Sequence, residues 1–80
     1  QALANAVNFY PNPASKQLAF RAGTAGAVEF VITDLTGRIV SEGLFTGTTQ
    51  LDVSSFAAGC YFVNLEANGE RACKKLLIEH

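Results

Sequence analysis

The 80-residue chain has no tryptophan and no methionine, and its single histidine is the last residue, His80. A histidine at a chain end is not held at the hydrogen-bonding distance that general-base catalysis needs. Asp34 and Asp52 are the remaining acid–base candidates, but each is next to a turn, where aspartate usually accepts a hydrogen bond from the backbone two residues on. We therefore expect a non-catalytic domain rather than an enzyme.

An excess of charge of one sign and long apolar runs are also absent. Six basic and seven acidic residues give a net charge of −1, and Lys74-Lys75 is the one basic pair. Without a basic stripe, nucleic acid is not an expected partner. The apolar runs are a few residues long, whereas a membrane-spanning helix needs about 20. The glycines at 23 and 26 lack the lysine of a phosphate loop, and no cofactor is expected.

The two cysteines are expected to remain free thiols. If Asn68-Gly69 forms a two-residue hairpin loop, residues whose numbers sum to 137 face each other. Cys60 and Cys73 then lie four residues apart along the ladder, which is roughly 13 Å and too far for a disulfide. A register slip or an intermolecular bond is the alternative. Cys60 is expected to be a small buried hydrophobe, and a metal site with Cys73 and His80 is not expected.

The apolar pattern predicts strands throughout. Turn signals recur about every 8 to 12 residues, and apolar residues alternate with polar ones between them. The expected strands are residues 7–10, 17–22, 27–34, 38–42, 48–53, 60–66 and 71–79, with a loop at 43–47 and a connection at 54–59 that can close into one helical turn. This pattern predicts an all-β, immunoglobulin-like antiparallel β-sandwich of about seven short strands. Residues 1–6 are expected to be a linker remnant, and residues 7–80 the domain.

Three segments carry a resemblance to a known family. Residues 8–15 contain Tyr-Pro-Asn-Pro, residues 31–40 contain an Asp-x-x-Gly-Arg turn, and residues 51–63 contain Leu and then Gly-x-Tyr, followed by Lys75. This ordered set resembles the type A C-terminal sorting domain of the type IX secretion (Por) system. The resemblance covers roughly residues 7–78, and we expect the chain to come from the C-terminal end of a longer protein.

By this resemblance, the domain is expected to direct an N-terminal cargo domain to the type IX translocon of a Bacteroidetes-type bacterium. A sortase-like protease would then remove it, and the cargo would reach the outer-membrane cell surface or be secreted, by way of the periplasm. The residues carried over from the family motifs are Pro11, Asn12, Pro13, Asp34, Gly37, Gly59, Tyr61 and Lys75. We expect most of them to build the fold, with Lys75 and the last strand as the direct contact.

Two other functions remain open from the sequence. A carbohydrate-binding or adhesive β-sandwich of an extracellular enzyme would need an exposed platform of aromatic side chains. A structural spacer, similar to the immunoglobulin-like domain of flagellar hook-capping proteins, shares the Asn-Pro opening and the Asp-x-x-Gly-Arg turn. In the parent protein, such a spacer would be followed by further chain after Ile78.

Overall fold

The structure of the chain is a computed structural model that describes residues 6–11, 14–23 and 26–79. Most of the expected linker remnant, the motif residues Asn12 and Pro13, and His80 lie outside the described residues. The strands are β1 (Val7–Tyr10), β2 (Gln17–Ala22), β3 (Val28–Thr33), β4 (Ile39–Phe45), β5 (Thr48–Asp52), β6 (Gly59–Ala67) and β7 (Glu70–Ile78).

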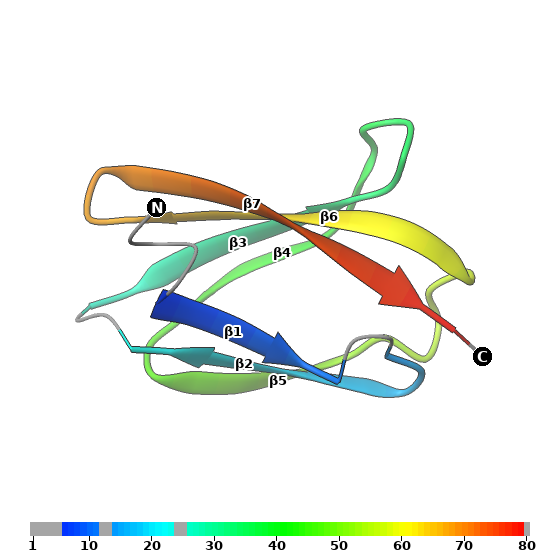
Figure 1. Cartoon of the computed structure of the whole chain (residues 1–80), viewed down its shortest axis with the longest axis horizontal. Coiled ribbons are helices and arrows are strands. Elements are labelled where there is room, and N and C mark those ends of the chain that lie inside the picture. The colour runs from blue at the N-terminus through cyan, green and yellow to red at the C-terminus, as the bar shows by residue number, and fades with distance from the viewer. Residues whose placement is uncertain (1–5, 12–13, 24–25, 80) are drawn as a thin grey trace.

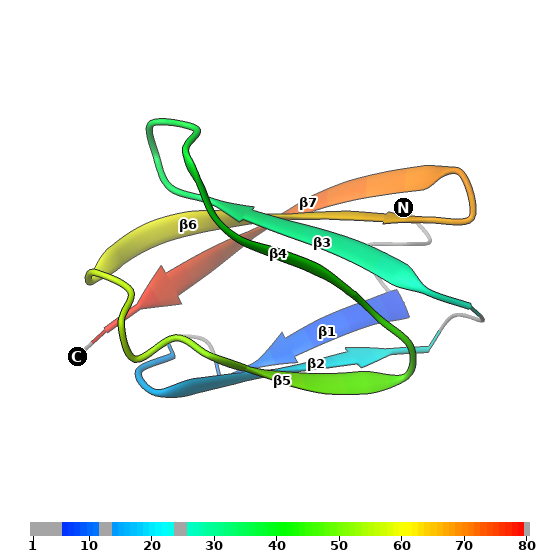
Figure 2. The ribbon, with the colours of Figure 1, turned by 180° about the vertical axis from the view of Figure 1, so that it is seen from behind.

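The strands form two antiparallel sheets packed face to face, which confirms the predicted sandwich (Figure 1). One sheet has the order β1-β2-β5 and the other β4-β3-β6-β7. The edge strands β1 and β7 lie on one side of the sandwich, and β4 and β5 lie on the other side, which Figure 2 shows from behind. The chain changes sheets three times: between β2 and β3, between β4 and β5, and between β5 and β6.

Alternation along each strand places one set of side chains between the sheets. In β6, Tyr61, Val63 and Leu65 are buried while the residues between them are exposed. Phe20 is at the centre of the core, because its ring centroid lies 5.7 Å from that of Phe9, 5.1 Å from that of Phe30 and 5.5 Å from that of Phe45. Aromatic rings at such separations join β1 and β2 of one sheet to β3 and β4 of the other.

The expected loop at residues 43–47 is wrong, because β4 continues to Phe45. Phe30 pairs with Gly43, and Val28 pairs with Phe45. A Cβ at position 43 would lie 3.1 Å from the Phe30 ring, so glycine is used here to make room for that ring within a strand. From the sequence, Gly43 was expected to be the first residue of the 43–47 loop. A bulge between Ile32 and Thr33 shifts the register at the start of β4.

The β6–β7 hairpin has the predicted register. Cys60 pairs with Leu77 and Asn64 pairs with Cys73, and both cysteines are free thiols. The prediction that Cys60 is buried is wrong: it is half-buried, because the alternation that sends Tyr61 inward sends Cys60 to the outer face. At the start of the 54–59 connection, the amide of Phe56 donates to the carbonyl of Val53 at 3.0 Å. This hydrogen bond closes a single turn of the chain.

Candidate functional site

The described motif residues other than Lys75 gather at one end of the sandwich. We call this the hairpin end, after the β3–β4 hairpin, and define it by the 34–37 turn, the 54–59 connection and Pro11. Strands β1, β3 and β7 finish there, while β4 and β6 begin there (Figure 1). Antiparallel pairing brings these segments together, because one strand ends where its neighbour begins. The loops that follow and precede them therefore lie at the same end of the sandwich. Pro11 is exposed and directly follows β1.

Asp34 holds the 34–37 turn through its side chain. Its Oδ1 accepts hydrogen bonds from the Thr36 amide at 2.9 Å, the Thr36 hydroxyl at 2.6 Å and the Arg38 amide at 3.1 Å. The Arg38 guanidinium lies 3.4 Å from Oδ2. Gly37 has a φ of +88° and donates its amide to the Asp34 carbonyl at 3.0 Å. This left-handed geometry favours glycine.

These contacts stabilise the ionised form of the Asp34 side chain. The hydrogen bond from the Thr36 hydroxyl, followed by those from the Arg38 and Thr36 amides, lowers the pKa of Asp34 below its ordinary value. Asp52 has the same arrangement with Ser54, whose hydroxyl and amide lower the pKa of Asp52. A carboxylate that is stabilised in its ionised form is poorly suited to accept and return protons near neutral pH. Both aspartates thus act as the turn acceptors that the sequence predicted.

Gly59 and Tyr61 shape the other side of the hairpin end. Gly59 has a φ of +146° where the chain enters β6, and it pairs with Ile78. The Tyr61 ring is buried, its centroid lies 5.5 Å from that of Phe56, and its hydroxyl donates to the Ala57 carbonyl at 2.6 Å. The tyrosine therefore ties the connection before β6 to the strand itself.

A hollow of about 710 Å³ opens at the hairpin end, between these two groups of residues. Residues 34–36, 38–40 and 55–61 line it. Leu35 and Ile39 at the hollow are 69% and 53% exposed, which is high for branched aliphatic side chains. Exposed apolar groups beside a hollow indicate a surface for contact with another molecule.

Lys75 is exposed on the outer face of the four-stranded sheet. It pairs with Phe62, Phe62 pairs with Thr33, and Thr33 pairs with Ile39. These side chains form one row across all four strands, which we call the outer row: Ile39, Thr33, Phe62 and Lys75. The outer row joins the motif lysine to the apolar side chains near the hollow.

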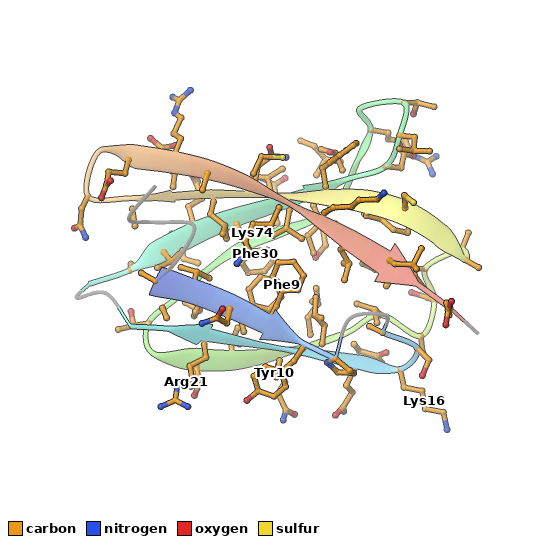
Figure 3. All side chains as sticks on the ribbon, in the orientation of Figure 1. Phe9, Tyr10, Lys16, Arg21, Phe30 and Lys74 are labelled. Atoms are coloured by element: carbon orange, nitrogen blue, oxygen red, sulfur yellow. The ribbon has the colours of Figure 1, made fainter. Side chains whose placement is uncertain are left out.

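Lys74 was not among the residues chosen from the sequence, although the alternation of apolar and polar residues along β7 places position 74 on the inward face. Position 74 lies on the same face as the buried residues Leu76 and Ile78. The Lys74 Nζ donates to the Val7 carbonyl of β1 at 2.9 Å and lies 5.6 Å from the centroid of the Phe9 ring. Figure 3 shows Lys74 and Phe9 between the two sheets.

The exposed aromatic side chains do not form one platform. Tyr10 is 54% exposed on the outer face of the three-stranded sheet, where Figure 3 shows it directed away from the core. Phe62 is 37% exposed on the outer face of the other sheet. The two rings thus face opposite directions, and a flat sugar-binding surface would need them on one side.

Within residues 6–11, 14–23 and 26–79, no group of three or more His, Cys, Asp or Glu side chains could hold a metal ion. Among the same residues, no helix is long and apolar enough to span a membrane. The described side chains offer turns, hydrogen bonds and apolar contact surface. They suit recognition by another molecule.

The comparison with protein families gives a match. A family model described as the secretion system C-terminal sorting domain matches residues 8–79, which is almost the whole chain. A comparison with curated proteins gave no match. The family match covers β2 to β7 in full and all of β1 except Val7, and it includes both sides of the hairpin end.

Proposed function

The chain belongs to the family of secretion system C-terminal sorting domains, and from this membership we propose that it is a non-catalytic address that carries a larger cargo protein to the type IX translocon. The role of the family is that of a sorting signal, so the parent protein is secreted or displayed at the cell surface. The cargo would be joined at the N-terminal side of this domain, and a sortase-like protease would remove the domain after export, as in the family.

The single observation that supports this proposal best is the family match over residues 8–79. Four of the motif residues support it further through their contacts and backbone geometry at the hairpin end. Asp34 and Gly37 hold one turn, and Gly59 and Tyr61 hold the other connection. We propose that a translocon component reads this end together with the outer row, and that Lys75 is the charged contact in that row.

An export assay tests the proposal. The chain is fused to the C-terminus of a passenger that has its own periplasmic signal peptide, in a strain with a type IX translocon and in an isogenic strain without it. We expect the passenger outside the cell only in the first strain. The Lys75→Glu variant should reduce the exported fraction several-fold without changing the circular dichroism spectrum. A folded fusion that remains in the periplasm of the first strain would refute the proposed function.

A further inference from the structure

Lys74 is an unusual residue for its position. The inward face of β7 is otherwise apolar, with Ala72, Leu76 and Ile78 buried against the other sheet. Lysine is rarely placed on a core-facing position unless its ammonium group finds a partner. Here the four-carbon stem can pack along apolar surface while the charged end reaches out of the core.

Two partners of Lys74 belong to the other sheet. Its Nζ donates to the carbonyl of Val7 at 2.9 Å and lies over the Phe9 ring, and both residues are on β1. A hydrogen bond from a charged donor is stronger than one between neutral groups, and a cation over an aromatic face gains further attraction. One side chain of β7 therefore holds β1 by two kinds of contact.

The Lys74 contact joins the two sheets at their edges, because β1 and β7 are edge strands of different sheets. β1 has four residues and forms its ladder with β2, while β7 forms its ladder with β6. Further along the same side, Ala14 donates its amide to the Leu77 carbonyl at 2.9 Å and accepts from the Glu79 amide at 2.8 Å. We call the side of the sandwich where β1 and β7 lie the seam. Among the described residues, hydrogen bonds thus join the two sides of the seam at two places, and Lys74 is at the place opposite β1.

We propose that Lys74 is a positioning residue of the sorting domain, which clasps β1 to β7 and so fixes how the last strand is presented to the export machinery. The second half of this inference rests on the proposed function, whereas the clasp itself does not. Neighbouring Lys75 has the same charge but lies on the outer face. The two lysines have different roles: Lys74 orders the strand, and Lys75 is the surface contact.

Hydrogen exchange of the backbone amides tests the clasp. Lys74→Met keeps an unbranched apolar side chain that is one atom shorter and removes the donor and the charge, and Lys75→Met is the matched control. We expect the amides of β1 to exchange at least tenfold faster in Lys74→Met, with little change in β3 and β6. Lys75→Met and Lys74→Arg should exchange like the unchanged chain. If Lys74→Met does not fold, Lys74→Leu, which also lacks the donor and the charge, takes its place in the same comparison.

Unchanged protection of β1 in the Lys74 variant would overturn the clasp. An equal rise of exchange in every strand would overturn it as well, because it would mean that Lys74 stabilises the whole domain and does not hold β1 in particular.

The export assay tests the positioning role. Lys74→Met is compared with Leu51→Ala, which removes half-buried apolar volume from β5, at the far edge of the sheet that contains β1. At matched thermal stability, we expect Lys74→Met to reduce the exported fraction at least fivefold, Leu51→Ala to leave it near the original value, and Lys74→Arg to restore it. Equal losses in Lys74→Met and Leu51→Ala would mean a purely structural lysine. If the unchanged domain itself fails to be exported, the proposed function fails, while the exchange result still decides the clasp.

Discussion

At the scale of single residues, Asp34 and Asp52 show how a carboxylate shapes a loop. Each accepts a side-chain and a backbone hydrogen bond from the residue two positions on, and each has a lowered pKa for that reason. Because the unfolded chain has the ordinary value of 3.8, it binds more protons than the folded chain at pH values near and below 3.8. Stability must therefore rise with pH in that window.

The lowered pKa values of Asp34 and Asp52 predict how the stability of the domain changes at acid pH. The stabilisation from the two aspartates is fully present above the unfolded-state pKa and is lost as the pH falls through their lower folded-state pKa values. The Asp34→Asn/Asp52→Asn variant keeps an acceptor oxygen at each turn but does not titrate. We expect its melting temperature, followed by circular dichroism, to depend less on pH below about 4 than that of the unchanged chain. Parallel pH profiles for the two proteins would contradict this prediction.

A second residue-scale prediction concerns Gly43. A Cβ at this position would lie 3.1 and 3.2 Å from Cε2 and Cζ of Phe30, whose ring packs against Phe20 and Phe45. The crowded ring has little room to move, so Gly43→Ala should lower the free energy of unfolding by about 1–3 kcal/mol in urea titrations. Gly23→Ala is the control, because its Cβ would make an ordinary 3.5 Å contact with the Ala6 carbonyl. A loss in Gly43→Ala no larger than in Gly23→Ala would disagree with the packing argument.

At the scale of elements, the β6–β7 hairpin could be predicted closely from the sequence. The Asn68-Gly69 loop, with φ values of 55° and 78°, sets the register, and the register sets which residues face outward. β4 was predicted less well, because a glycine beside a ring and a glycine in a turn look alike in a sequence. Alternation also does not say which strands are neighbours. The pairing of β3 with β6 and of β2 with β5 joins distant parts of the chain, and the hairpin end depends on it.

The hairpin register also predicts the chemistry of the two thiols. Both cysteines lie on the outer face of the sheet, but Cys73 is exposed while Cys60 is half-buried. We expect iodoacetamide to alkylate Cys73 several-fold faster than Cys60 in the folded chain, with equal rates after denaturation. Peptide mass spectrometry over a time course measures the two rates. A protected Cys73, or an intramolecular disulfide in the untreated chain, would contradict the register.

At the scale of the whole molecule, the proposed recognition surface depends on the shape of the sandwich. The turns of the hairpin end, the outer row and the clasped seam all depend on two sheets that meet through a small aromatic core. An 80-residue domain has a free energy of unfolding of about 4–12 kcal/mol. A single core residue can carry a large part of that stability, so an address encoded in shape should be sensitive to core changes far from any contact surface.

Phe20 provides the test of that idea. Its side chain is 1% exposed, and its ring contacts the Phe9, Phe30 and Phe45 rings across both sheets. Removing the ring in Phe20→Ala should cost about 3–5 kcal/mol, enough to unfold a domain near the lower end of the range. The export assay should then show the passenger retained in the periplasm. Leu44→Ser is the matched surface change, because Leu44 is 69% exposed and contributes little to the core, and its fusion should be exported as before. Export of an unfolded Phe20→Ala fusion would show that the machinery reads a linear segment, and the claim that the address is a folded surface would have to be withdrawn.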